Sequence, residues 1–179
     1  MACPSLSLDF PGKSMTWGGA QRKARNPMPR HAETKLLPYG AGQMYDLVGD
    51  VARYPEFIPW IMAARVRSVT PVEGGEVMLA DLVIGFRMFR EKFGSRVTFY
   101  PDQRRIETRY LDGPFKHMIS NWEFHEAAGG CEVRFDVDFE FRSKILQGAA
   151  GLFFHEAMLR IVRAFEARAA VLYGDAGAT

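Results

Sequence analysis

The sequence predicts one α+β domain, in which a curved antiparallel sheet of about seven strands wraps around a long C-terminal helix. Several segments between residues 64 and 141 alternate apolar and polar side chains with a period of two, which is typical of a sheet with one buried face. Residues 144–174 instead repeat apolar side chains every three or four positions, which is typical of an amphipathic helix. A chain of 179 residues is long enough for one domain with a sizeable core.

The N-terminal elements are a strand and two short helices. "RHAETKLL", residues 30–37, reads as a strand that a proline closes. "AGQMYDLVGDV", residues 41–51, carries apolar side chains at helical intervals. In "DVARYPEFIPW", residues 50–60, we expect Asp50 to cap a second short helix, with one proline in its first turn and another ending it.

The remaining strands follow in sequence order, and Glu73-Gly74-Gly75 forms a hairpin turn between the first two of them. The strand residues expected to face the interior are Met78, Ala80, Leu82, Ile84, Phe86, Phe89, Glu91, Phe93, Ser95, Val97, Phe99, Ile106, Thr108, Tyr110, Met118, Ser120, Trp122, Phe124, Val133, Phe135, Val137, Phe139 and Phe141. The helix is expected to begin after Ser143, to stop at Gly174 and to face the sheet with Phe154, Met158, Ile161, Phe165, Ala169 and Leu172. This order of elements predicts a helix-grip fold.

Residues 1–28 differ in composition from the rest, with Pro, Gly, Ser and basic residues and no hydrophobic periodicity. They hold four of the 23 Lys and Arg residues and one of the 21 Asp and Glu residues, so the remainder carries a net charge of −1. That near-neutral body gives no support to a nucleic-acid partner, DNA included. We expect residues 1–28 to be a disordered or non-native leader, with a targeting segment as the competing interpretation. The domain is expected over residues 29–174, with residues 175–179 as a tail.

The cysteines and histidines argue against two kinds of site. Cys3 and Cys131 are the only cysteines, which argues against a disulfide framework and fits a reducing compartment. The four histidines have no close metal-ligand spacing, and no apolar run is long enough to span a bilayer. We therefore expect a cytoplasmic protein without a metal or a resident cofactor, whose contact with the inner membrane is at most peripheral.

Three stretches carry a resemblance to a known family: "YPEFIPW" (54–60), "YLDGPFKHMISNWEF" (110–124) and "FDVDFEFRSKILQ" (135–147). With the order of elements, they resemble the START-like, polyketide cyclase superfamily. Over about residues 30–173 the chain is similar to coenzyme Q-binding proteins that support respiration, and to bacterial relatives known as ribosome-association toxins. One departure is Ile61, which stands where a Cys often follows the Pro-Trp pair, so no role of that thiol carries over. The resemblance implies the helix-grip fold and leaves both activities open.

The space between sheet and helix is expected to be either a filled core or a ligand cavity. Its walls would be Phe93, Phe99, Tyr110, Trp122, Phe135, Phe139, Met158, Ile161 and Phe165. Hydroxyls of Ser95, Thr108, Ser120 and Tyr110 lie on the same predicted faces, and ligand pockets commonly combine apolar walls with a few polar groups. Quinone carbonyls are uncharged acceptors, so one or two such donors would suffice. With the resemblance, this favours a non-enzymatic carrier or chaperone for a polyprenyl quinone such as ubiquinone, held as a bound ligand.

Two apolar connections are expected to meet at the cavity mouth. They are the stretch around residues 54–60 and the turn "LDGPF", residues 111–115. Together they would form an apolar rim, through which an isoprenoid tail could pass or which could touch a membrane surface: Tyr54, Phe57, Trp60, Leu111 and Phe115. The competing interpretation is that both turns simply cap the end of the core.

Two other functions remain open from the sequence. A cyclase or aromatase needs a general acid or base in the cavity. Glu91, Tyr110 and Arg109 are candidates, but no catalytic triad or paired carboxylates can be read from spacing, and Glu91 fits a solvated strand end better. A ribosome-binding protein needs a basic surface, for which neighbouring strands offer Arg87, Arg90, Lys92, Arg96, Arg104, Arg105 and Arg109. Acidic residues on the same strands, among them Glu107 and Asp136, favour an ordinary solvated face instead.

Overall fold

The computed structural model describes residues 30–86 and 89–174, and within these ranges the side chains of residues 86, 89, 146 and 149–155 are excepted. The elements in chain order are β1 (Arg30–Leu37), α1 (Ala41–Gly49), the 3-10 turn η1 (Val51–Arg53), α2 (Tyr54–Phe57), β2 (Ile61–Val72), β3 (Gly75–Phe86), β4 (Phe89–Tyr100), the 3-10 turn η2 (Pro101–Gln103), β5 (Arg105–Asp112), β6 (Phe115–Ala127), β7 (Gly130–Phe141) and α3 (Lys144–Tyr173). The expectations for residues 1–28, for residues 175–179 and for Arg87 lie outside the described residues.

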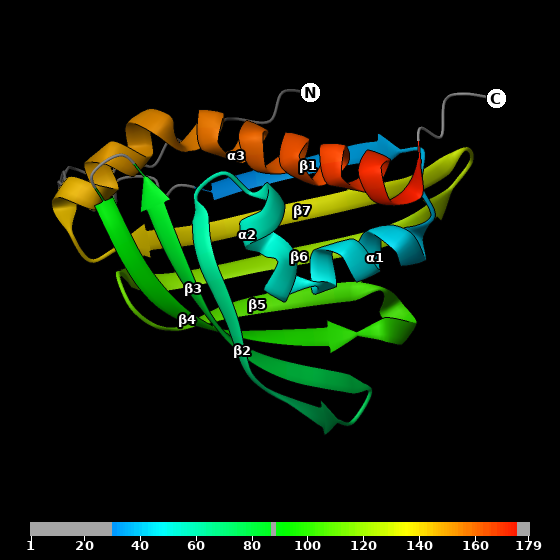
Figure 1. The fold of residues 1–179 in the computed structure, drawn as a ribbon, viewed down its shortest axis with the longest axis horizontal. Coiled ribbons are helices and arrows are strands. Elements are labelled where there is room, and N and C mark those ends of the chain that lie inside the picture. Colours follow the sequence, from blue (N-terminus) through cyan, green and yellow to red (C-terminus); the bar gives the residue numbers. More distant parts are fainter. Residues whose placement is uncertain (1–29, 87–88, 175–179) are drawn as a thin grey trace, which may run out of the picture.

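The seven strands form one antiparallel sheet in the order β1-β7-β6-β5-β4-β3-β2. Figure 1 shows the sheet curving around α3, with α1, η1 and α2 lying against the same side of the sheet as α3. The predicted helix-grip fold is thereby confirmed, including the two short helices after the first strand. The edges of the sheet are β1 and β2. The last strand of the chain, β7, lies between β1 and the other five strands.

Two glycines shape the turns at opposite ends of the sheet. Gly74, with φ of 75°, makes the predicted turn of the β2–β3 hairpin. Gly113, with φ of 125°, makes the β5–β6 turn, and a Cβ atom there would come within 2.5 Å of the carbonyl oxygen of Lys92. The β5–β6 turn therefore packs directly on β4, and only a glycine fits it.

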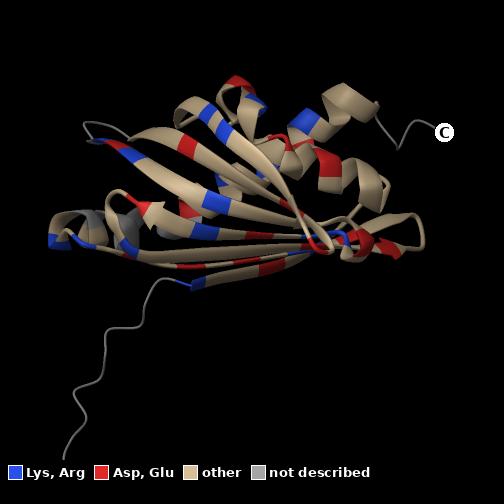
Figure 2. Cartoon of the chain, turned by 90° about the horizontal axis from the view of Figure 1, so that it is seen from below, with Lys and Arg blue, Asp and Glu red and all other residues tan. Residues whose placement is uncertain are grey.

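The predicted alternation of the strands is confirmed on the inner face of the sheet. Buried side chains there include Ala80, Leu82, Phe93, Ser95, Val97, Phe99, Ile106, Ser120, Phe124, Val133, Phe135, Val137 and Phe139. The outer face carries charged side chains, and acidic residues prevail along β7 (Figure 2). One face is therefore wet and one is covered, as the period of two requires.

The covered side of the sheet divides into a filled half and a hollow half. In the filled half, α1 presses Met44, Leu47 and Val48 against Phe99, Phe124 and the C-terminal part of α3. In the other half, the buried residues include Leu82, Phe93, Phe115, Phe135, Val137 and Phe139, and they surround a space instead of filling it. The short helices therefore decide which part of the grip is core and which part is cavity.

The connection after α1 differs in one detail from the sequence prediction. Asp50 precedes η1 and makes no side-chain cap, so the prediction that it caps the second helix is wrong. The second helix, α2, begins with Tyr54-Pro55 and ends where Ile58 turns extended, just before Pro59. The Tyr54 hydroxyl donates a 2.6 Å hydrogen bond to the carbonyl oxygen of Val48, which fastens α2 to the end of α1.

Helix α3 spans the concave side of the sheet and ends at Gly174, whose φ of 82° is the predicted left-handed stop. Phe165 and Ala169 are buried, but Leu172 is 49% exposed, so its place in the predicted apolar stripe is wrong. Arg168 donates a 2.7 Å hydrogen bond to Glu56 of α2, and Glu166 pairs with Lys35 of β1. These two interactions hold α3 against α2 and against the edge strand β1. No described helix is both long and apolar enough to cross a membrane.

Candidate functional site

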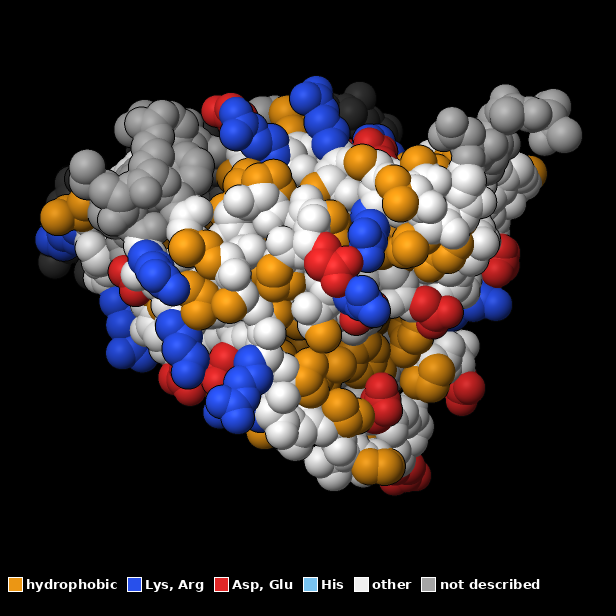
Figure 3. All heavy atoms as spheres, in the orientation of Figure 1, with side chains coloured by type: hydrophobic (Ala, Val, Ile, Leu, Met, Phe, Trp, Pro, Cys, Tyr) orange, Lys and Arg blue, Asp and Glu red, His pale blue; other side chains and the backbone are white. Residues whose placement is uncertain are grey.

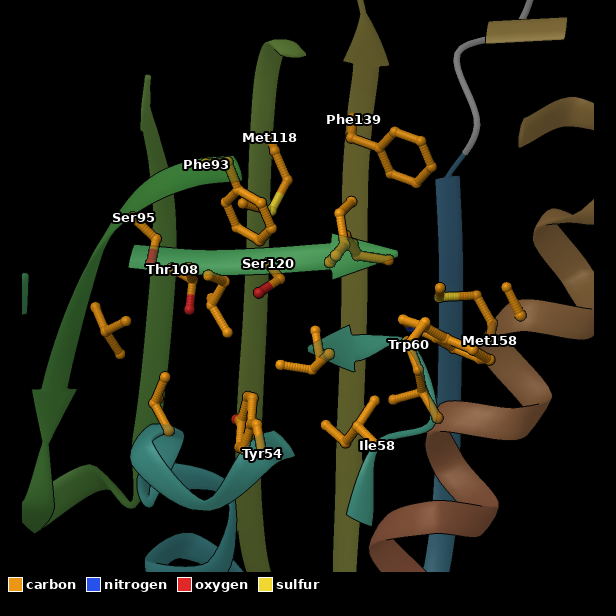
Figure 4. Close-up of a pocket in the computed structure, with 18 of the residues that line it drawn as sticks. Tyr54, Ile58, Trp60, Phe93, Ser95, Thr108, Met118, Ser120, Phe139 and Met158 are labelled. Carbon is orange, nitrogen blue, oxygen red and sulfur yellow. The ribbon is translucent and has the colours of Figure 1, made fainter. Parts of the chain in front are cut away.

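A cavity of about 350 Å³ lies between the concave face of the sheet, α2 and α3 (Figure 4). It is lined by Val48, Val51, Tyr54, Ile58, Trp60, Ile61, Leu82, Ile84, Glu91, Phe93, Ser95, Val97, Ile106, Thr108, Phe115, Met118, Ser120, Trp122, Phe135, Val137, Phe139, Phe141, Ala157, Met158, Ile161 and Phe165. Its walls are therefore almost wholly apolar, and its size lies at the lower end of the range for small-molecule pockets, roughly 300–1,000 Å³.

The cavity extends along strand β4. Four alternate residues of this strand line it: Glu91, Phe93, Ser95 and Val97. Six residues of strand correspond to roughly 20 Å. At the Val97 end the wall is closed by side chains that are 2% exposed, including Val48 and Val97 itself. At the other end Glu91 is only partly buried. An unpaired carboxylate needs water, so Glu91 marks the wet end of the cavity.

Ten of the fourteen ligand-binding residues proposed from the sequence line this space: Tyr54, Trp60, Phe93, Phe115, Trp122, Phe135, Phe139, Met158, Ile161 and Phe165. Their role in binding stays a prediction, since the geometry shows only that they come together. Phe115 is a wall and not a rim residue, because it is 6% exposed and stacks on Phe141 with ring centroids 4.6 Å apart.

The other four proposed residues, Phe57, Phe99, Tyr110 and Leu111, lie elsewhere. Phe99 belongs to the filled half, where its ring meets Tyr45 edge-on at 6.3 Å. Phe57 is half-buried against the filled half, and its ring meets Phe165 with centroids 5.2 Å apart. Leu111 is 45% exposed near the end of β5. The environment of each of these residues depends on the position of α1, α2 or the β5–β6 turn, which the sequence does not show.

Tyr110 lies behind the cavity wall. Its ring meets Phe115 edge-on with centroids 5.5 Å apart, and its hydroxyl is buried without a hydrogen-bond partner in the described part of the chain. The predicted contribution of this hydroxyl to the cavity is therefore wrong. A buried hydroxyl without a hydrogen-bond partner destabilises the folded state. The Tyr110 hydroxyl is therefore expected to lower the free energy of unfolding.

Four hydroxyl groups do reach the cavity, and they divide into two pairs. Tyr54 donates to the Val48 carbonyl, and Ser95 donates to the Ala80 carbonyl at 3.3 Å. The hydroxyls of Thr108 and Ser120 have no hydrogen-bond partner among the described residues. Figure 4 shows Ser95, Thr108 and Ser120 along the sheet wall, one on each of three neighbouring strands. The free pair can therefore donate to a molecule in the cavity.

The titration behaviour of the site is that of an apolar space. Burial of its hydroxyl end raises the pKa of Tyr54 well above the ordinary value of tyrosine, with a smaller contribution from the nearby Asp50 carboxylate. Tyr54 is therefore a neutral hydrogen-bond donor at physiological pH and not a base. Glu91 is the one carboxylate among the described lining residues. No three His, Cys, Asp or Glu side chains in the described part of the chain gather as a metal site.

Part of the lining is not predicted as cavity wall from the sequence. Val48, Val51, Ile58 and Ile61 come from the short helices and the start of β2, and Ala157 comes from α3. The alternation predicts a further set of residues for the inner face but not for the cavity: Leu82, Ile84, Val97, Ile106, Met118, Val137 and Phe141. Glu91 had been placed in solvent, whereas it borders both solvent and cavity. The inner-face alternation was the available signal for the strand residues, and helical spacing was the signal for Ala157, which stands four positions before Ile161.

Comparison with known proteins agrees with this geometry. Residues 37–166 match the family described as polyketide cyclase/dehydrase and lipid transport. The ribosome association toxin RatA of Rickettsia prowazekii is 36% identical over 139 residues, which cover 76% of this chain and 92% of that protein. The mitochondrial coenzyme Q-binding protein COQ10 homolog B of Xenopus laevis is 33% identical, over 80% of this chain and 59% of that protein. Neither name is that of an enzyme.

Two solved structures show the same fold. The 18 kDa protein CC1736 from Caulobacter crescentus is 36% identical, with a TM-score of 0.70 over 83% of this chain and all of that one. The Zhui aromatase/cyclase from Streptomyces sp. R1128 has a TM-score of 0.71 over 85% of this chain and 99% of that one, but its identity of 16% supports the fold alone. On the family match and these relatives, the chain belongs to the polyketide cyclase/dehydrase and lipid transport family.

Proposed function

We propose that the protein is a non-enzymatic carrier or chaperone that holds a polyprenyl quinone in the cavity between the sheet and α3. The observation that carries this proposal is the combination of a nearly all-apolar wall with two hydroxyl donors, Thr108 and Ser120, that have no hydrogen-bond partner among the described residues. An isoprenoid chain matches the wall, and the uncharged carbonyls of a quinone match the donors. The coenzyme Q-binding relative supports the same ligand class.

The energy of such a complex is adequate. Burial of apolar surface contributes roughly 25 cal/mol per Å², so a ring and a few isoprene carbons that lose about 300 Å² of surface gain roughly 7 kcal/mol before the costs of binding. The walls are already formed by rings in mutual contact, such as Trp122 on Phe135 with centroids 4.0 Å apart. Little side-chain order then has to be imposed when the ligand enters.

A carrier fits the residues better than a cyclase does. General acid–base chemistry needs a proton donor or acceptor aimed at the reacting atom. Glu91 stands alone at the wet end of the lining, Tyr110 lies behind the wall, and Arg109 lies on the outer face, where it pairs with Glu107 at 2.5 Å. None of the three candidates faces another across the cavity.

An occluding substitution tests the proposal. Ala157→Trp adds nine non-hydrogen atoms to a wall of the cavity, which at roughly 20 Å³ each would occupy about half of its volume. Ala167→Trp on the exposed side of the same helix is the matched control. The full chain is incubated with vesicles that contain polyprenyl quinone, repurified, and its quinone is quantified by redox difference absorbance. We expect near-equimolar quinone in the parent and in Ala167→Trp, and at least roughly tenfold less in Ala157→Trp. Equal loading of both variants would contradict the proposal.

A second candidate function is binding to a ribosomal subunit, and one observation favours it. Arg96 and Arg109 stand directly opposite each other on β4 and β5, an arrangement that is destabilising for like charges. Exposed Arg65, Arg67, Arg90 and Lys92 lie on neighbouring strands, and Figure 3 shows Lys and Arg side chains gathered over the β2–β4 part of the molecule. Asp81 offsets this charge through Lys92 at 3.2 Å and Arg67 at 3.4 Å.

Salt dependence separates the two functions. Binding to rRNA through this surface would weaken steeply with salt and would be lost in Arg96→Glu but kept in Arg134→Glu, which changes an exposed arginine of β7. Co-sedimentation with ribosomal subunits at two salt concentrations measures this. If sedimentation is absent or is equal for both variants, the second candidate is rejected, and quinone loading remains to be judged separately.

A further inference from the structure

Thr108 and Ser120 face each other across the β5–β6 pair. They are directly opposite in the register of these strands, and both line the cavity. Side chains at opposite positions of an antiparallel pair have Cβ atoms about 5 Å apart. One acceptor oxygen placed between them can therefore accept a hydrogen bond from both hydroxyls.

These two hydroxyls are set apart from the other polar groups of the site. Ser120 is only 9% exposed, and neither it nor Thr108 has a partner within the described structure. Leaving a buried hydroxyl unpaired is costly. Ser95, on the neighbouring strand, shows that the fold can satisfy such a group, because its hydroxyl donates to the Ala80 carbonyl. The unpaired donors therefore point to an acceptor that enters from outside.

Resting on the proposed function, we propose that Thr108 and Ser120 form the head-group subsite, and that the ligand lies with its ring at this pair and its tail directed toward Glu91. Trp122 is the next inward residue of β6 after Ser120, and it stacks on Phe135 to give a flat wall for a planar ring. No lysine or arginine is among the described lining residues. A phosphate or carboxylate head would have no counter-charge there, so the head is a neutral ring that bears hydrogen-bond acceptors.

The size of the cavity limits how much of the ligand is enclosed. At the packing density of organic crystals a non-hydrogen atom takes roughly 20 Å³, so a cavity of about 350 Å³ holds on the order of 17 such atoms. A substituted quinone ring with one isoprene unit has this size. Thr108 is opposite Val97 in the β4–β5 register, and Val97 and Glu91 are six residues apart along β4, or roughly 20 Å. A ring at Thr108 and Ser120 therefore lies at the closed end, and the ring with its first one or two isoprene units spans most of the distance to the wet end. Affinity is therefore set by the head and the first one or two units, and longer tails add little.

The test compares a ligand that has a ring with one that lacks it. Quinones with one, two and four isoprene units, and squalene as a ring-free isoprenoid, are titrated into the full chain. Fluorescence quenching reports quinone binding, because Trp60 and Trp122 both line the cavity. Squalene binding is followed by its competition with the bound quinone. The variant is Thr108→Val with Ser120→Ala, which removes both hydroxyls with little change of shape, and Ser68→Ala on the exposed part of β2 is the control for loss of a hydroxyl outside the cavity.

We expect each lost hydroxyl to weaken quinone binding roughly five- to tenfold, while squalene binding stays unchanged and Ser68→Ala binds both ligands like the parent. Affinity should rise from one to two isoprene units and then stay constant. Quinone affinity of the double variant within twofold of the parent, or equal losses for quinone and squalene, overturns the subsite alone. A parent that binds neither ligand overturns the proposed function itself. If the double variant does not fold, the two single variants carry the same test.

Discussion

Two tyrosines in similar apolar surroundings should respond in opposite ways to loss of the hydroxyl. Tyr54 donates a 2.6 Å hydrogen bond to the carbonyl of Val48, which lies in the last turn of α1, where helix carbonyls have no intrahelical partner. Val48 is 2% exposed, so no water replaces the phenol. Tyr110 carries a buried hydroxyl for which the residues of the two described ranges, 30–86 and 89–174, offer no hydrogen-bond partner.

The magnitudes follow from these partners. In Tyr54→Phe, a net hydrogen bond of about 1 kcal/mol is lost and a buried carbonyl is left unsatisfied at a further 1–3 kcal/mol, so the free energy of unfolding should fall by roughly 2–3 kcal/mol. A loss of about 2 kcal/mol lowers the Tm by roughly 4–8 °C for a domain of this size. In Tyr110→Phe, only an unpaired polar group is removed, so stability should stay constant or rise by up to about 1 kcal/mol.

Urea unfolding of both variants and the parent, followed by far-UV circular dichroism, measures the two changes. The slope of unfolding free energy against urea should be unchanged, since neither substitution alters the surface exposed on unfolding. A Tyr110→Phe variant that loses as much stability as Tyr54→Phe would refute the reasoning. It would mean that the Tyr110 hydroxyl makes a hydrogen bond in the folded protein.

Three further predictions concern stability. Gly113→Ala should lower the free energy of unfolding by at least about 3 kcal/mol, because the new Cβ would meet a β4 carbonyl at 2.5 Å. Gly74→Ala should lower it by only about 1 kcal/mol, because this residue has a positive φ but open space around it. Thermal unfolding of the two variants measures the difference. Phe124→Ala in the filled half should lower the free energy of unfolding by about 3–5 kcal/mol. Phe139→Ala in the cavity wall should lower it clearly less, because a void already adjoins this ring. Equal losses in chemical unfolding would argue against the division of the interior into a filled and a hollow half. Because burial raises the pKa of Tyr54, unfolding is favoured as the pH rises above about 10, where only the unfolded phenol ionises; stability measured from pH 8 to 11 should fall less in Tyr54→Phe.

The strands and the long helix could be predicted from the sequence because their periodicity is direct evidence of a buried face. Phe93, Val97 and Phe135 were assigned inward on alternation alone, and all three are 8% exposed or less. Leu172 was misassigned because helical spacing shows which residues share a face, but not where the partner surface ends. It lies in the last turn of α3, where it stays 49% exposed.

The cavity itself could be predicted only in part. Alternation placed Phe99 and Phe93 on the same inner face, yet one packs under α1 and the other borders the cavity. The difference depends on where α1 docks, a long-range contact that leaves no local pattern. The same holds for the hydroxyls, since Ser95 and Ser120 look equivalent in sequence, and only the register brings Ser95 to the Ala80 carbonyl and leaves Ser120 opposite Thr108.

The most direct test of the central claim is mass spectrometry of an organic extract from the full chain as purified, beside Ala157→Trp and Ala167→Trp. We expect a neutral polyprenyl quinone at about one per chain in the parent and in Ala167→Trp, and its loss from a folded Ala157→Trp. An extract that contains no quinone, repeated after the protein has been exposed to quinone-loaded vesicles, would contradict the carrier function and leave the cavity as a packing feature of the fold.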